Sequence, residues 1–145
     1  MGTVADIDLV VVSLKVGAAQ SPALFILLAR DGTVNRLGTG AVDNTERDLF
    51  IGRTTEPLFP ALMNQFTDAM LQHVGGYEMR DRKGEDCRLS IALRFADGSE
   101  DGFGFLYGSE SEGPPQEIVQ IVIEAARLTD PWYEAQKKTA SAGKK

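Results

Sequence analysis

One pattern occurs twice in this chain and constrains its fold more than any other feature. Between Ala23 and Gly38, an apolar run, the pair Asp31-Gly32 and a return run follow one another. The same order recurs between Cys87 and Tyr107, where the pair is Asp97-Gly98. Asp-Gly between alternating apolar residues is a strong β-hairpin signal, and an apolar stripe of helical period follows each hairpin after a loop. The pattern therefore predicts two strand–strand–helix units.

An additional strand is expected before the first unit. The segment from Ile7 to Val16 is short and rich in β-branched residues, which favours a strand over a helix. Val10 and Val12 lie on one face of this strand, and Leu9 and Val11 lie on the other. A strand with two apolar faces sits centrally in a sheet or faces a partner.

The register of the second hairpin follows from burial. With a two-residue loop, Phe103 would oppose Ala92, and the aromatic residues of the return strand would face away from the aliphatic row of the first strand. With the three-residue loop 96–98, Phe103 opposes Ile91 and all the large groups share one face. A one-residue slip turns every side chain to the other face, and each buried aromatic contributes roughly 1.5–3 kcal/mol. We therefore expect the three-residue loop, with Gly98 at positive φ.

Two amphipathic helices are expected. The first runs roughly from Pro57 to Val74 and is ended by Gly75-Gly76. The second runs from about Pro115 or Gln116 to Leu128, and Asp130-Pro131 ends it. The long connection between the first hairpin and the first helix carries Leu49-Phe50-Ile51, which predicts a short extra strand; a lid or partner-binding loop is the alternative.

The second helix is more apolar than one core-facing stripe requires, because Ile118, Ile121 and Val122 belong to a run with little room for a polar face. Its surface should therefore meet a second layer. If that layer is another subunit, these three residues form the interface of a homodimer. The alternative is that Trp132-Tyr133 and the 49–51 segment cover the helix within one chain.

These elements predict an α+β fold: an antiparallel sheet of about five strands in β-ββα-ββα order, with two helices packed on it. A chain of 145 residues fits one domain, which we place at residues 1–136. Residues 137–145 hold four lysines, no acid and no apolar periodicity. They are expected to form a disordered basic tail.

Charge and hydropathy exclude several classes of protein. The net charge is −6, so the residues before the lysine-rich tail carry −10 together, and such a body repels nucleic acid. The longest apolar run, Ala23 to Ala29, is too short to span a membrane. The N-terminus shows no signal peptide, and a single cysteine excludes an internal disulfide framework. We expect a cytoplasmic protein.

No motif for catalysis, a metal or a cofactor is present. One histidine and one cysteine exclude a zinc-protease helix and a CxxC pair. Cys87 falls on the apolar face of its strand, which favours an inert core residue. The acids Asp97, Glu100 and Asp101 could hold a hard cation but lack the spacing of an EF-hand loop. We predict no catalytic residue, metal or cofactor, and the sequence leaves open whether the chain is an enzyme.

Two functional hypotheses remain. The first is a non-enzymatic interaction or structural module that self-associates as a homodimer. The second is a small-molecule-binding protein or enzyme with a pocket between sheet and helices, for a ligand that the sequence does not identify. The polar candidates for such a pocket are His73, Arg88, Arg94 and Tyr107.

Overall fold

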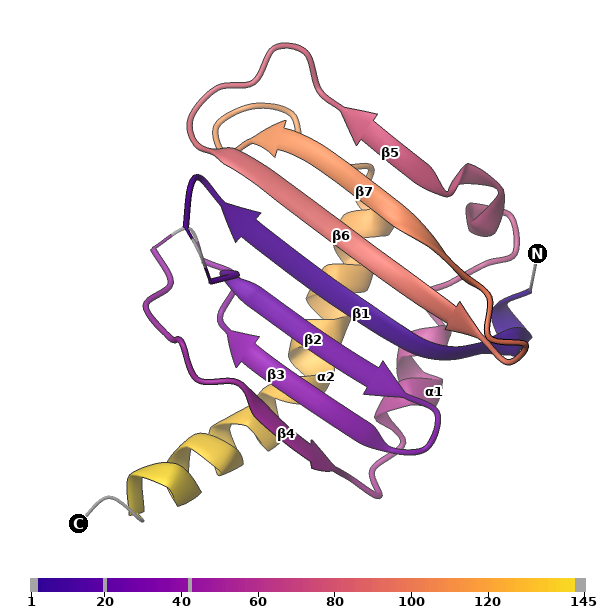
Figure 1. Ribbon diagram of the computed structural model, residues 1–145, viewed down its shortest axis with the longest axis vertical. Helices are drawn as coiled ribbons and strands as arrows, with labels where there is room; N and C mark the ends of the chain where they lie inside the picture. The colour runs from indigo at the N-terminus through magenta and orange to yellow at the C-terminus, as the bar shows by residue number, and fades with distance from the viewer. Residues whose placement is uncertain (1–2, 20, 42, 143–145) are drawn as a thin grey trace.

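The computed structural model describes residues 3–19, 21–41 and 43–142. Seven strands of the described chain form one sheet (Figure 1). They are β1 (Ile7–Val16), β2 (Leu24–Ala29), β3 (Thr33–Gly38), β4 (Phe50–Arg53), β5 (Gly75–Glu78), β6 (Asp86–Phe95) and β7 (Glu100–Gly108). The α-helices are α1 (Leu58–Met63) and α2 (Gln116–Ala142), and the short 3-10 helices are η1 (Val4–Asp6) and η2 (Met70–His73).

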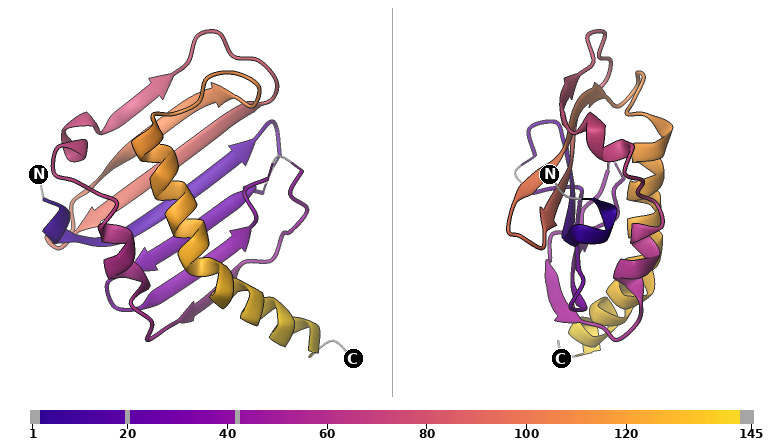
Figure 2. Two further views of the ribbon diagram at one scale, coloured as in Figure 1. Left: turned by 180° about the vertical axis from the view of Figure 1, so that it is seen from behind. Right: turned by 90° about the vertical axis from the view of Figure 1, so that its right-hand side faces the viewer.

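The strand order is β4-β3-β2-β1-β6-β7-β5. Neighbouring strands are antiparallel except β5, which runs parallel to β7. Both α-helices lie on the same side of the sheet (Figure 2), and the core lies between the two layers. The α+β class is as predicted, but the sheet is larger than the expected five strands and is mixed rather than antiparallel.

The two edge strands account for the difference. Strand β4 contains most of the predicted 49–51 segment, so the expectation of an extra strand there is confirmed. Strand β5 begins at the glycine pair that was expected only to end a helix. Each edge strand has four residues, which is too few for a period-two pattern to stand out.

The register expected for the second hairpin is confirmed. Ile91 lies opposite Phe103, and Leu89 lies opposite Phe105. Gly98 has a φ of +87°. All four apolar side chains are buried on the helix side of the sheet. Burial of large side chains therefore decided between two loops that differ by one residue.

The two hairpins use the same turn. In the first, the Asp31 carboxylate accepts hydrogen bonds from the amide and hydroxyl of Thr33 at 2.9 and 2.7 Å. In the second, the Asp97 carboxylate accepts from the amide and hydroxyl of Ser99 at 2.9 and 2.6 Å. Each carboxylate is held in a local side-chain turn of the kind that Asp favours. The two Asp-Gly pairs that recur in the sequence therefore form turns with the same hydrogen bonds.

The predicted helix from Pro57 to Val74 is broken in the structure. Helix α1 ends at Met63, and η2 resumes at Met70. Between them, the Thr67 hydroxyl accepts the Met70 amide at 3.2 Å, and the Asp68 carboxylate accepts the Val4 amide at 2.8 Å. Short polar side chains that bond to backbone groups in this way compete with a continuous helix.

Helix α2 is longer than predicted, because it passes through Pro131 and reaches Ala142. Contacts beyond the proline hold it: Trp132 packs over Gly52, and Tyr133 meets Phe50 edge-on at 5.9 Å between ring centroids. The expectation of a disordered tail from residue 137 is wrong for residues 137–142, which are helical. Residues 143–145 lie outside the described residues.

The turn conformation can be tested with one pair of variants. Gly98→Ala should lower the free energy of unfolding by about 1–2 kcal/mol, because an L side chain is strained at positive φ. The space around residue 98 is open, so no clash contributes. Gly104→Ala, a strand position with equally open space and no positive φ, should cost nothing. Urea denaturation measures both, and equal effects would contradict the explanation.

Candidate functional site

The four polar residues expected to line a pocket lie on two sides of the sheet. Along β6, side chains alternate between buried and exposed, and Arg88 and Arg94 are on the exposed side. Tyr107 lies opposite buried Cys87, on the helix side, where burial raises the pKa of its hydroxyl. His73 lies at the end of η2 and lines a pocket on the helix side. The structure therefore does not bring the four residues together.

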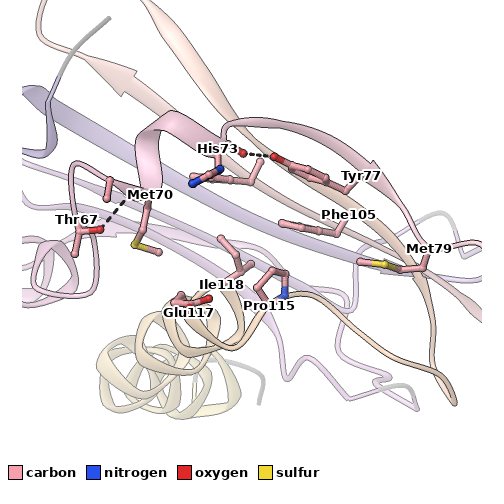
Figure 3. A pocket seen from close by; sticks show the side chains of 11 residues that line it. Thr67, Met70, His73, Tyr77, Met79, Phe105, Pro115, Glu117 and Ile118 are labelled. Carbon is pink, nitrogen blue, oxygen red and sulfur yellow. Dashed lines mark hydrogen bonds between the residues drawn. The ribbon is translucent and has the colours of Figure 1, made fainter.

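The pocket beside His73 has a volume of about 580 Å³ and lies between η2, β5, β7 and the first turn of α2 (Figure 3). We call it the β5 pocket. Its apolar walls are formed mainly by Met70, Tyr77, Met79, Phe103, Phe105 and Ile118. Thr67, His73 and Glu117 add polar groups at its edge. The volume and the mostly apolar lining are typical of a small-molecule site.

Tyr77 gives the β5 pocket its flat wall. The parallel pairing of β5 with β7 sets Tyr77 opposite Phe105, and the two rings stack at 5.1 Å with an interplanar angle of 14°. The Tyr77 hydroxyl donates a hydrogen bond to the carbonyl oxygen of His73 at 2.6 Å. In the sequence, the charge-rich segment from Tyr77 to Asp86 indicates a solvated turn or strand end, which does not identify the Tyr77 ring as part of a pocket. No short sequence pattern identifies this role, because it depends on the parallel pairing of β5 with β7.

A second cluster of polar groups ties α2 to β3. Arg36 is only 2% exposed, although it occupies a strand position on the helix side. Its guanidinium donates to the hydroxyl of Thr129 at 2.9 Å and to the carboxylate of Asp130 at 2.8 Å. The carbonyl oxygens of Gly38 and Ala126 accept further bonds at 3.1 and 3.2 Å. A buried guanidinium is tolerated because it is paired in this way.

Tyr133, Glu46 and Lys137 extend this cluster. The Tyr133 hydroxyl accepts the Gly38 amide at 2.8 Å and donates to the Glu46 carboxylate at 2.5 Å. Lys137 lies 3.2 Å from the same carboxylate. The hydrogen bond from Tyr133, and then that from Lys137, hold the pKa of Glu46 below its ordinary value. Since each of these groups has a partner, the cluster holds the helix in place and leaves no polar group free for a ligand.

The side of the sheet away from the helices carries an apolar row. Figure 1 views this open face, with both helices behind the strands. The cross-strand register aligns Ala92, Val11, Leu27, Asn35 and Ile51 across five neighbouring strands, from β6 to β4. We call this set the middle row. Its ends are the most accessible, since Ala92 is exposed and Ile51 is 69% exposed.

Asn35 interrupts the middle row. Its Oδ1 atom is buried and has no hydrogen-bond partner among the described residues. An unpaired buried acceptor costs about 1–3 kcal/mol. The side chain therefore stands as an unsatisfied polar group within an otherwise apolar row.

The residues expected to form an interface on α2 are covered within the chain. Ile118 and Ile121 are buried under the sheet, with Ile121 fully inaccessible, and Val122 packs against the same core. The second layer required by the apolar helix is therefore the sheet of the same chain. This cover differs from the predicted one, because Trp132-Tyr133 belong to α2 itself.

The remaining chemical candidates do not form a site. The described residues contain no group of three or more His, Cys, Asp or Glu side chains that could hold a metal ion. Burial raises the pKa of the Cys87 thiol, and two neighbouring acids add to the effect. Among the described helices, none combines the length and apolar character needed to cross a membrane.

Neither a protein-family model, a curated protein nor a solved structure matches this chain. The β5 pocket on the helix side and the middle row on the open face are apolar surfaces that the described chain offers to a ligand or a partner.

The Glu46 cluster predicts how stability depends on pH. A carboxyl whose pKa is lowered by folding stabilises the protein above its ordinary pKa of 4.5, and this stability is lost as pH falls through the folded value. Glu46→Gln should therefore cost about 1–2 kcal/mol at neutral pH and progressively less below pH 4.5. Urea denaturation across this range measures the difference. Glu112→Gln, at an exposed position, is the control. A pH-independent difference for Glu46→Gln would contradict the role assigned to its charge.

Proposed function

We propose that this protein is a non-enzymatic interaction module that self-associates as a homodimer through the open face of its sheet. The observation that carries the proposal is the middle row: apolar side chains aligned across neighbouring strands, on the side that neither described helix covers. Contiguous apolar surface of this kind marks interaction sites in soluble proteins. A non-enzymatic role is supported by the separation of the polar candidates onto two faces.

The open face is large enough for a stable dimer. Seven strands about 4.8 Å apart, with an average length of about seven residues at about 3.3 Å per residue, give a projected area of roughly 780 Å². A standard interface buries about 800 Å² per partner, and side-chain relief makes accessible area larger than projected area. Two open faces stacked at about 10 Å, as in a β-sandwich, would therefore reach the usual size.

Charge supports a contact centred on the middle row, which itself holds no ionised group. The ionised groups of the open face lie toward the strand ends: they include the cations Lys15, Arg53, Arg88 and Arg94 and the acids Glu78 and Glu100, with Glu100 opposite Arg94. In a two-fold contact about an axis through the middle row, apolar groups meet apolar groups. The ionised groups of both copies then approach one another only at the rim, where solvent and salt screen them.

Asn35 gives a second reason to expect another copy of the chain against the open face. Its unpaired Oδ1 has no donor within the described chain. A rotation of the Asn35 amide toward the open face would let a donor of the second copy satisfy it. Asparagine pairs at otherwise apolar contacts fix register in coiled-coil dimers by the same chemistry.

The proposal predicts a dimer that depends on the middle row. Light scattering at micromolar concentration should give twice the 15.7 kDa chain mass for the wild type. Ala92→Lys and Ile51→Glu place charges at exposed positions of the row and should give folded monomers. Ile123→Glu, at a 49% exposed position of α2 on the opposite side, should leave the dimer intact.

Salt provides an independent check of the same proposal. Each copy carries a net charge of −6, so the two copies repel one another, and added salt that screens this repulsion should make the dimer tighter. A wild-type monomer, or a dimer broken by Ile123→Glu but not by Ala92→Lys, would show that the open face is not the contact. A weaker dimer at high salt would point to attraction between opposite charges and away from the middle row.

A further inference from the structure

The β5 pocket has a wall shaped for a flat ring. Tyr77 is 42% exposed, yet it is held in place by its stacking on Phe105 and by the hydrogen bond from its hydroxyl to the His73 carbonyl oxygen. Figure 3 shows the two rings beside the hollow, above Ile118 at the beginning of α2. Aromatic rings pack against one another in offset or edge-on geometry, with about 0.5–1.5 kcal/mol beyond the area that they bury. An aromatic guest therefore fits this wall better than an aliphatic one.

Two methionines make the rest of the pocket adaptable. Met70 and Met79 line it from η2 and from the end of β5, and their thioethers lie on either side of the hollow in Figure 3. Methionine side chains are flexible and make favourable sulfur–aromatic contacts. The volume of about 580 Å³ falls within the range of roughly 300–1,000 Å³ that small-molecule sites occupy. The pocket is thus large enough for one or two fused rings.

The charged residues of the β5 pocket indicate whether its ligand should be a cation or an anion. Among the described lining residues, Glu117 is the one acid, and neither lysine nor arginine is present. The positive end of the α2 dipole lies here too, but its roughly half charge is smaller than the full charge of the Glu117 carboxylate. The faces of the Tyr77 and Phe105 rings also attract cations. The electrostatics therefore favour a positively charged group and oppose an anion.

We propose that the β5 pocket binds a small aromatic amine, with its ring against the Tyr77–Phe105 wall and its ammonium group toward Glu117. The imidazole of His73 forms no hydrogen bond with another described residue and offers a further polar contact at the pocket edge. This site lies on the helix side of the sheet, so it is independent of self-association through the open face.

The test compares two probes that share a ring and differ in charge. Tryptamine and indole-3-propionate are titrated against the full chain by ligand-observed saturation-transfer NMR and calorimetry. Tryptamine should bind at least about tenfold more tightly, the ratio expected from one partly solvated charge pair. Glu117→Gln should remove most of this preference while leaving the ring contact intact.

A blocking variant separates the pocket from the rest of the surface. Ala69 is exposed and lines the β5 pocket, so Ala69→Trp should fill the hollow without disturbing the core and should abolish tryptamine binding. Ala135→Trp, at an exposed position farther along α2, should bind like the wild type. Circular dichroism and the melting temperature establish that both variants fold.

Three results would overturn the proposal: no tryptamine binding at millimolar concentration, equal binding of the two probes, or unchanged binding by Ala69→Trp. The monomeric variant Ala92→Lys should bind tryptamine like the wild type. The outcome of the ligand experiment is therefore distinguishable from the outcome of the dimer experiment.

Discussion

Strand β1 joins the two halves of the sheet, because it pairs with β2 of the first hairpin on one side and with β6 of the second hairpin on the other. Its position explains why both of its faces are apolar. Val10 and Val12 enter the core beneath the helices, whereas Val11 lies at the centre of the open face. The strand that makes one sheet out of two hairpins therefore also creates the apolar surface on which the dimer proposal rests.

The buried charge of Arg36 determines where α2 must run. A guanidinium taken out of water costs several kcal/mol unless it is paired, so the helix has to bring the Thr129 hydroxyl and the Asp130 carboxylate to this point. The contacts of Tyr133 then continue the same attachment beyond Pro131. Pro131, which in the sequence predicts the end of a helix, is therefore tolerated inside α2. Tertiary contacts on both sides of the proline outweigh the helix stability that it costs.

Short sequence patterns predicted the structural features that depend on residues close together in the chain. Alternation and Asp-Gly turns were sufficient for both hairpins, and burial alone selected the register of the second. Arg36 could not be interpreted from the sequence, because the two side chains that bind its guanidinium, Thr129 and Asp130, lie more than 90 residues away. Tyr77 depended on a parallel pairing that no short pattern reveals. Arg88 and Arg94 are different. The register that sets Ile91 beside Phe103 places both arginines on the face of the sheet opposite the aromatic residues. The sequence alone therefore showed that the two arginines and Tyr107 could not line one pocket.

The β5 pocket and the open face have one geometric origin, a sheet wider than its helical layer. Helix α2 crosses from β7 toward β4, and α1 fills the space beside it, so the uncovered part of the helix side falls at β5 (Figure 2). The strand that widens the sheet thus also supplies Tyr77 for the wall of the gap. Neither α-helix of the described residues lies on the other side, so the middle row stays uncovered there, which is the surface that the dimer proposal uses.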